Sequence, residues 1–341
     1  MLTKLLLCHP RESGDPDKKP ITNFKNWIPA YAGMTTNSFS RFITHFIALI
    51  SFTLLLTACV PKAPDITVPA HMPPDVIPQQ QPRVALVLGG GGMRGAAHLG
   101  VIKVLEENHI PIDLIVGTSS GSIVGVLYAD DPNADELNER FMKLKRSDMI
   151  DASVFSQEGG FDNGYTLQKF ILKNVQAKEF DQLKIKLVVV ATDLSNGNAV
   201  ALSSGPIAPA INASSAIPPV FRPVKLYGYT LADGGASEVV PVEIAERYHP
   251  KVIIAVDVER TPPTDITGKT MFDIAGRYSI LRAKNYSLYQ AEQADILIQP
   301  QVGMTGTFDF SARPAMILAG EQATAAELPA IKKLLREKGI M

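Results

Sequence analysis

The sequence predicts an α/β fold in three layers, with helices on both faces of a central, mostly parallel sheet. Short, nearly continuous apolar runs are typical of strands that are buried on both faces, and residues 83–88 and 252–258 are two such runs. Longer segments between the runs carry apolar residues at helical spacing, as in a chain of alternating strands and helices. The stretch from 83 to 341 is long enough for one large domain with a buried core.

The expected elements follow one another along the chain. A strand at 83–88 leads through a glycine-rich loop into a helix at 96–108, in which Leu99, Ile102 and Leu105 have helical spacing. A second strand at 114–116 precedes a helix at 122–128. Farther along we expect a strand at 229–232, a helix at 242–248, a strand at 252–258, a helix at 271–293, a strand at 296–298 and a helix at 314–338.

Ser119 lies between two glycines, in Gly-Thr-Ser-Ser-Gly at 117–121, where the second strand passes into its helix. A serine at such a tight turn, called a nucleophile elbow, can project its hydroxyl above the sheet edge. Flanking glycines allow the turn without a Cβ clash. The motif also occurs in ordinary turns, so the pattern by itself leaves a structural turn and a catalytic serine open.

A glycine-rich loop at 89–95 joins the first strand to its helix. Exposed amides at a helix N-terminus favour an anion, and four consecutive glycines allow a negative oxygen to approach bare main chain. The anion could be a dinucleotide pyrophosphate, because Gly90, Gly92 and Gly95 match G-x-G-x-x-G, or the oxyanion of an acyl intermediate. A ribose-binding carboxylate belongs at the carboxyl end of the second strand, whereas Asp113 precedes that strand. Ser119 occupies the carboxyl end instead, which favours acyl transfer.

Histidine is the usual base for a serine nucleophile, but none of the six histidines is well placed. Most of them precede the folded region or lie near the opposite edge of the sheet. His98, in the first turn after the glycine loop, is interpreted as a packing or loop-bracing residue. A carboxylate is then the candidate base, and Asp233 follows a short apolar strand and precedes two glycines. An ordinary Asp-Gly turn is the alternative reading of that segment.

Several blocks together resemble the patatin-like phospholipase family, over about residues 83–320. They are the glycine loop with His98, Gly100 and Val101, the elbow at 117–121, the stretches 191–194 and 213–221, and Asp-Gly-Gly at 233–235. The resemblance implies a patatin-like fold and a Ser-Asp dyad, with Ser119 as nucleophile and Asp233 as base. It further implies an oxyanion hole made by the amides of Gly90, Gly91 and Gly92. Arg94 holds the family's arginine position, where it braces the loop or attracts anionic head groups.

The expected activity is lipid acyl hydrolysis of a phospholipid or simpler ester through an acyl-enzyme. Acyl transfer to another acceptor shares this chemistry, and a non-catalytic lipid-binding lipoprotein is a third reading, although the intact motifs argue against it. We expect no metal and no cofactor, since the chain has two cysteines and no metal-binding pattern. With 33 basic and 34 acidic residues, nothing favours nucleic acid as a partner. Tyr286 and Tyr289 are interpreted as packing residues.

The sequence before residue 83 indicates where the protein is located. Residues 34–58 resemble a lipoprotein signal peptide that ends in Leu-Thr-Ala before Cys59, and 1–33 form a doubtful N-terminal extension. The resemblance to a lipobox implies cleavage before Cys59 and lipid attachment to its thiol, with an uncleaved membrane anchor as the alternative. Because Val60 rather than an aspartate follows, we expect the outer membrane, facing the periplasm. Residues 59–82 are expected to form an extended proline-rich tether.

Overall fold

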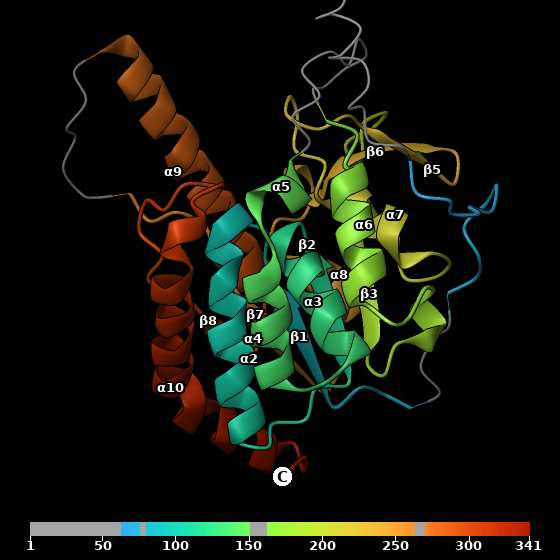
Figure 1. Cartoon of the computed structure of the whole chain (residues 1–341). Coiled ribbons are helices and arrows are strands. Elements are labelled where there is room, and N and C mark those ends of the chain that lie inside the picture. The colour runs from blue at the N-terminus through green and yellow to red at the C-terminus, as the bar shows by residue number, and fades with distance from the viewer. Residues whose placement is uncertain (1–62, 76–79, 151–161, 263–269) are drawn as a thin grey trace, which may run out of the picture. The chain divides into compact units, whose positions relative to one another are not determined.

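A computed structural model describes residues 63–75, 80–150, 162–262 and 270–341. In this part of the chain, eight strands form one sheet in the order β5-β6-β3-β2-β1-β7-β8, and β4 pairs with β3 (Figure 1). The strands are β1 Val84–Leu88, β2 Leu114–Thr118, β3 Lys186–Asp193, β4 Ala199–Leu202, β5 Val224–Leu226, β6 Tyr229–Asp233, β7 Val252–Val256 and β8 Ile296–Ile298.

Helices precede and follow these strands. The sequence predicts those near 96–108, 122–128, 242–248, 271–293 and 314–338, but not the helices between 134 and 214 or the strands β3, β4 and β5. The α-helices are α2 Ala97–Glu107, α3 Ser120–Asp130, α4 Ala134–Lys143, α5 Arg146–Met149, α6 Tyr165–Asn174, α7 Ile207–Ser214, α8 Val242–Glu246, α9 Met271–Ala291 and α10 Arg313–Glu337. The 3-10 helices are η1 Gly92–Ala96, η2 Phe180–Gln182, η3 Gly234–Ala236 and η4 Phe310–Ala312. None of the helices in the described ranges is long and apolar enough to cross a membrane.

The sheet has a parallel and an antiparallel part. Strands β3, β2, β1, β7 and β8 are parallel, whereas β4 and β6 run antiparallel to β3, and β5 runs antiparallel to β6. The carboxyl ends of β1 and β2 therefore lie side by side, as the glycine loop and the elbow require. Because β6 runs the other way along β3, Asp233 pairs with Ala191 within the sheet.

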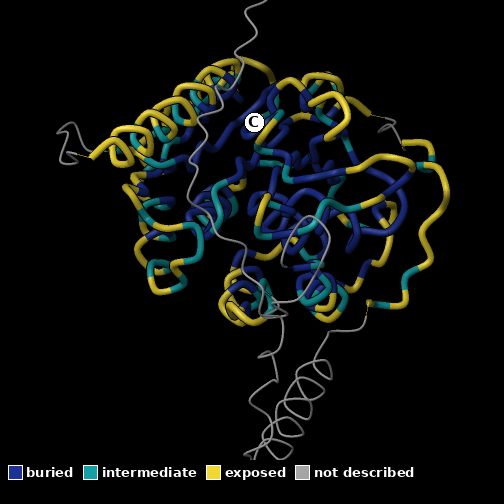
Figure 2. The backbone as a smooth tube through the Cα atoms, turned by 90° about the horizontal axis from the view of Figure 1, so that it is seen from above, coloured by how far each residue is buried: buried dark blue, intermediate teal, exposed yellow. Residues whose placement is uncertain are grey.

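Both faces of the sheet are buried, which explains the nearly continuous apolar strands (Figure 2). Val84, Leu86 and Leu88 of β1 belong to a large core that includes residues of α2, α3 and α10. Ala85 and Val87 point the other way, into a smaller core that α8 covers. The α2–α10 contact is close: a Cβ on Gly100 would lie 2.0 Å from the carbonyl oxygen of Ile317. Gly100 therefore serves helix packing.

Part of the proline-rich segment is not a free tether. The carboxylate of Asp75 accepts hydrogen bonds from Lys186 and from the Tyr248 hydroxyl, and the Ser204 hydroxyl donates to the carbonyl of Pro73. Ile66 and Met72 pack against the large core. The expectation of an extended spacer is therefore wrong for 63–75, because these contacts hold that stretch against the domain. Cys59, the signal segment 34–58 and residues 1–33 lie outside the described residues.

Candidate active site

Ser119 is the single residue between β2, which ends at Thr118, and α3, which begins at Ser120. Its backbone has φ 53° and ψ −120°, in the positive-φ region that residues with a side chain rarely adopt. Strain of this kind is concentrated at functional sites. The sequence predicts a tight turn here, and the structure places the unusual φ on the serine itself.

The flanking glycines allow close backbone approach. A Cβ on Gly121 would lie 2.0 Å from the carbonyl oxygen of Leu88, at the carboxyl end of β1. A Cβ on Gly117 would lie 2.7 Å from the carbonyl oxygen of Gly121. Any larger residue at either position would push α3 away from the sheet. The tight turn therefore requires both glycines of the motif.

Side chains hold the elbow from both sides. The Ser119 amide donates to the Ser214 hydroxyl at 2.8 Å, and that hydroxyl donates to the Val190 carbonyl of β3 at 2.6 Å. The Ser122 hydroxyl donates to the Ser119 carbonyl at 2.6 Å. The backbone groups of Ser119 are thus satisfied by fixed neighbours, and its side chain is left to react.

Asp233 ends β6 and lies beside Ser119. One carboxylate oxygen, Oδ1, accepts from the Gly235 amide at 2.8 Å, while Oδ2 is buried without a well-aligned partner in the described part of the chain. Burial raises the pKa of Asp233 to about 6, although the nearby Ser119 hydroxyl and the Gly235 amide both act to lower it. An aspartate with this pKa is a stronger base than an ordinary one and is still mostly ionised at neutral pH.

One short segment positions both members of the pair. Ser214, at the end of α7, anchors the Ser119 amide, and two residues later the Ala216 carbonyl accepts from the Asp233 amide at 2.9 Å. The Thr192 hydroxyl of β3 donates to the Asp233 carbonyl at 2.9 Å. Sequence reasoning singled out 213–221 only as a family block and did not identify Ser214 as an anchor. Its position at the end of an apolar helix gave no signal of that role.

The glycine loop lies against the elbow, since a Cβ on Gly90 would be 3.3 Å from the Ser119 Cβ. The expectation that Gly90 contributes an oxyanion donor is not supported, because its amide already donates to the Val239 carbonyl at 2.8 Å. Gly91 is the N-cap of η1 and Gly92 is its first residue, and backbone donors at a helix start have no partner within the helix. The amides of Gly91 and Gly92 are the candidate oxyanion donors.

Arg94 is buried and braces the loop. Its guanidinium donates to the Val258 carbonyl at 2.9 Å, to the Thr305 carbonyl at 3.2 Å and to the Glu259 carboxylate at 3.2 Å. These contacts link the glycine loop to the segments after β7 and after β8. With its charge paired inside the protein, Arg94 does not offer a head-group site, so bracing is the role that the structure supports.

His98 also braces the loop, as expected. Its side chain is fully buried, and Nε2 lies 2.8 Å from the Gly89 carbonyl. Burial lowers the pKa of His98 to about 4, which keeps the imidazole neutral at ordinary pH. Asp113 pairs with Arg83 at 2.8 Å, just before β1, and so lies at the opposite edge of the sheet as predicted.

An apolar pocket opens beside the nucleophile. Ser119, Gly92 and the hydroxyl-bearing Ser120 and Ser215 form its polar wall. The rest of its lining is almost entirely apolar, and it comprises Met93, Ile123, Phe141, Leu144, Met149, Ile217, Phe221, Thr307, Phe308 and Phe310. The lining, with a reactive serine at one wall and aromatic and aliphatic side chains around it, is chemically suited to an acyl chain.

The interpretation of the two tyrosines of α9 as packing residues is wrong. Tyr289 is largely exposed, and Tyr286 is exposed while its hydroxyl donates to the Ser237 carbonyl at 2.5 Å. Ser237 lies in the turn that follows Asp233. Tyr286 therefore supports the catalytic loop from the surface.

The chain is similar to one protein-family model and to several curated proteins. Residues 86–246 match the family model described as patatin-like phospholipase. Over 187 residues the chain is 37% identical to Lysophospholipase NTE1 of Scheffersomyces stipitis, covering 52% of this chain and 12% of that protein. Over 199 residues it is 32% identical to human Patatin-like phospholipase domain-containing protein 6, covering 54% of this chain and 14% of the other. The chain thus spans about an eighth of the length of these curated relatives.

The solved structure of VipD from Legionella pneumophila has a similar fold. The TM-score is 0.51 at 14% sequence identity, and the match covers 81% of this chain and 72% of the other.

Proposed function

Because residues 86–246 of this chain match the patatin-like phospholipase family model, we propose that the protein is a lipid acyl hydrolase with a Ser119–Asp233 dyad. The observation that carries the proposal is the site itself. Ser119 is held at positive φ at the wall of an apolar pocket. Beside it lies a buried carboxylate oxygen of Asp233 for which the described residues provide no other well-aligned partner.

In the first half of the reaction, Asp233 accepts the proton of the Ser119 hydroxyl while its oxygen attacks the ester carbonyl carbon. The carbonyl oxygen gains negative charge and is held by the amides of Gly91 and Gly92. As the tetrahedral intermediate collapses, the bond to the alcohol oxygen breaks. The proton on Asp233 passes to that oxygen, and the acyl group remains on Ser119.

In the second half, water attacks the acyl-enzyme and gives its proton to Asp233. The same two amides hold the oxyanion, the bond to the Ser119 oxygen breaks, and the proton returns to that oxygen. The fatty acid leaves the apolar pocket and the site is restored. Asp233 thus alternates between base and acid, a cycle that its pKa of about 6 suits near neutral pH.

For the substrate, we propose a phospholipid or lysophospholipid. The apolar lining of the pocket supports an acyl chain rather than a polar acid, and two of the curated relatives are named as a lysophospholipase and as a phospholipase-domain protein. The head group stays outside this pocket in such a binding mode.

For location, we propose attachment to the outer membrane through a lipid on Cys59, facing the periplasm. The support is the sequence alone, an apolar run that ends in Leu-Thr-Ala-Cys and is followed by Val60.

The test is fatty-acid release from lysophosphatidylcholine in water enriched in the heavy oxygen isotope. We expect release by the wild-type chain with one heavy oxygen in each fatty acid, and loss of release in Ser119→Ala and Asp233→Asn. Transfer of the acyl group to another acceptor without heavy oxygen in the product would contradict hydrolysis. Undiminished release by Ser119→Ala would contradict the dyad.

A further inference from the structure

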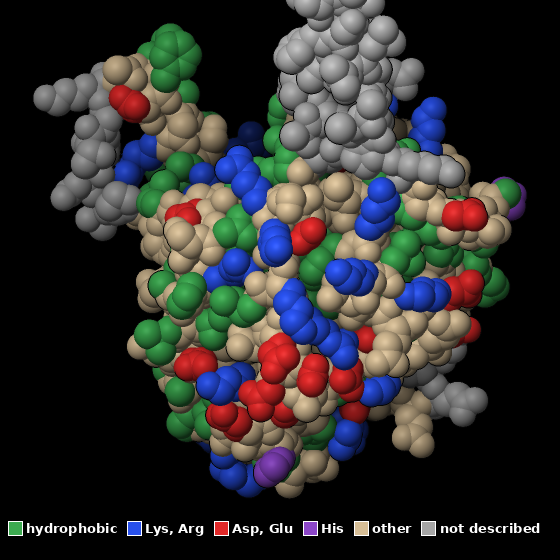
Figure 3. Space-filling view, viewed as in Figure 1, with side chains coloured by type: hydrophobic (Ala, Val, Ile, Leu, Met, Phe, Trp, Pro, Cys, Tyr) green, Lys and Arg blue, Asp and Glu red, His purple; other side chains and the backbone are tan. Residues whose placement is uncertain are grey.

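The first half of α9 carries large apolar side chains that the described part of the chain does not cover. Met271 is 75% exposed, Phe272 81%, Ile274 58% and Tyr278 67%. The helix start is nonetheless well defined, because Thr270 and Asp273 cap each other through their side chains and backbone amides. In Figure 1 this half projects away from the sheet, and Figure 3 shows apolar surface at its tip. A contiguous exposed apolar surface of this kind marks an interaction site.

The second half of α9 is fastened beside the active site. Lys284 and the Ser287 hydroxyl donate to the carboxylate of Asp257, just after β7, at 2.9 Å and 2.5 Å. Tyr286 and Gln290 donate to the Ser237 carbonyl, in the turn after Asp233. The exposed tip is therefore rigidly connected to the carboxyl edge of the sheet, where the pocket lies.

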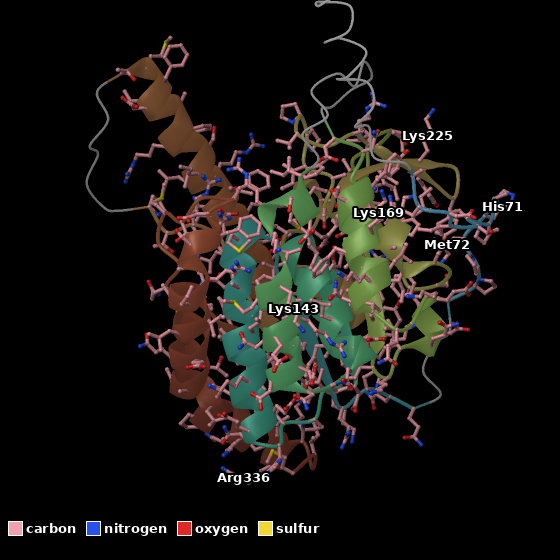
Figure 4. All side chains as sticks on the ribbon, in the orientation of Figure 1. His71, Met72, Lys143, Lys169, Lys225 and Arg336 are labelled. Atoms are coloured by element: carbon pink, nitrogen blue, oxygen red, sulfur yellow. The ribbon has the colours of Figure 1, made fainter. Side chains whose placement is uncertain are left out.

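Cations gather near the same edge. One groove formed by α4, α5, α6 and their connections is lined by a single carboxylate, Asp148, and by four lysines: Lys143, Lys145, Lys169 and Lys173. Figure 3 shows Lys and Arg over the half of this face nearer the projecting helix and more acidic side chains over the other half. In Figure 4, Lys225 and Lys169 lie toward the end from which α9 projects, Lys143 lies near the middle, and Arg336 lies at the opposite end. This arrangement is complementary to an anionic surface.

A bilayer fits the tip better than a second protein copy. Residues 271–276 are all exposed, whichever way they point around the helix. A single protein face would cover one side of a helix, whereas lipid can surround all sides. A stable protein interface also needs about 800 Å² from each partner, which less than two turns of helix cannot supply, while a few aromatic and aliphatic residues beside cations suffice at a membrane surface.

We propose that the free end of α9 inserts into the head-group region of an anionic bilayer and turns the pocket of Ser119 toward it. The biological role of this insertion rests on the proposed function, because a lipid hydrolase must take its substrate from such a surface. The insertion itself does not depend on catalysis.

The test uses intrinsic fluorescence in the full chain. Trp27 is the only tryptophan, so Trp27→Phe gives a dark background, in which Phe272→Trp reports on the tip and Arg336→Trp is the control at the opposite end. Ser119→Ala is added so that hydrolysis plays no part. Vesicles contain equal parts of phosphatidylcholine and phosphatidylglycerol, with or without brominated acyl chains. We expect a blue shift and quenching by brominated lipid for tryptophan at 272 and neither for tryptophan at 336.

Unchanged emission from position 272 while the chain sediments with the vesicles would overturn the proposal. So would a blue shift without vesicles that grows with protein concentration, because that result identifies a second copy as the occupant. In the otherwise unaltered chain, Phe272→Asp should lower hydrolysis of vesicle phospholipid at least tenfold and leave turnover of a soluble short-chain ester unchanged. If insertion is seen but neither ester is hydrolysed, the proposed function fails and the docking surface stands.

Discussion

The Ser214 hydroxyl ties the backbone of Ser119 to the central sheet. It accepts from the Ser119 amide at 2.8 Å and donates to the Val190 carbonyl of β3 at 2.6 Å. The two serines are separated by 95 residues in the chain. A residue of α7 thus fixes the strained elbow. Two residues after Ser214, the Ala216 carbonyl accepts a hydrogen bond from the Asp233 amide.

Ser214→Ala should lower both stability and activity. It leaves a buried amide and a buried carbonyl without their partner, which costs about 1–3 kcal/mol for each group that water does not reach. With the elbow released, we expect kcat to fall at least tenfold. Ser204→Ala is a matched control, because Ser204 is also buried and bonds a backbone carbonyl, that of Pro73, away from the elbow. Urea unfolding and ester kinetics on both variants measure the two effects, and an equal kcat in the two would contradict the anchoring role.

Acylation should require the ionised form of Asp233. Since its pKa is raised to about 6, we expect kcat/KM to fall about tenfold per pH unit below that value. His98→Gln should keep this acid limb, because the pKa of His98 is lowered to about 4 and the glutamine amide can still bond the Gly89 carbonyl. Disappearance of the limb in His98→Gln would instead identify the histidine as the titrating base.

Asp233→Asn should stabilise the protein at neutral and higher pH. The pKa of Asp233 is raised from 3.8 to about 6 on folding, so the folded state disfavours the carboxylate. The stability linked to its protonated form is complete below about pH 3.8 and is lost as pH rises through about 6. At about 1.4 kcal/mol per pKa unit, the variant should gain on the order of 2–3 kcal/mol relative to wild type near pH 8. Denaturant unfolding near pH 8 and near pH 4 checks this, and an equal difference at both would refute it.

Gly91→Ala should damage catalysis more than stability. An added Cβ would lie 2.7 Å from the Val258 Cγ2 and 3.0 Å from the Val258 carbonyl oxygen, so the loop must shift. Displacing one oxyanion donor costs roughly a hundredfold to a thousandfold in kcat. Gly276→Ala, where nothing lies within 4 Å of the new Cβ, should leave kcat unchanged. Normal turnover in a folded Gly91→Ala would exclude this amide from the oxyanion hole.

The parts of the site that sequence could predict are those encoded by neighbouring residues. The two glycines and the preceding apolar run mark Ser119 as a candidate nucleophile, and the place of the glycine loop between strand and helix marks that loop as an anion site. The choice of Ser119 and Asp233 as a dyad needed the resemblance of several blocks to a family. The hydrogen bond from the Gly90 amide to the Val239 carbonyl could not be predicted, because only the folded chain brings these two residues together. The hydrogen bond between the Ser119 amide and the Ser214 hydroxyl could not be predicted for the same reason.

The helices and strands near 83–128 and 229–338 were predictable because their apolar patterns are local, whereas β3, β4, β5 and the helices from α4 to α7 were not predicted. Among the predicted elements, α9 is the instructive exception. Its span follows from the sequence, but its large apolar residues stay outside the core, which only the small Ala291 at its end enters. A pattern of apolar residues indicates a surface to be covered and does not specify whether protein or lipid covers it.

The Ser119–Asp233 dyad is tested most directly by intact-mass measurement of the chain after reaction with a fluorophosphonate. The account predicts one phosphonyl adduct per wild-type chain, none in Ser119→Ala, and much slower labelling in a folded Asp233→Asn. A folded wild-type chain that stays unlabelled in the presence of lipid vesicles, or a Ser119→Ala chain that is labelled as fast as wild type, would contradict it.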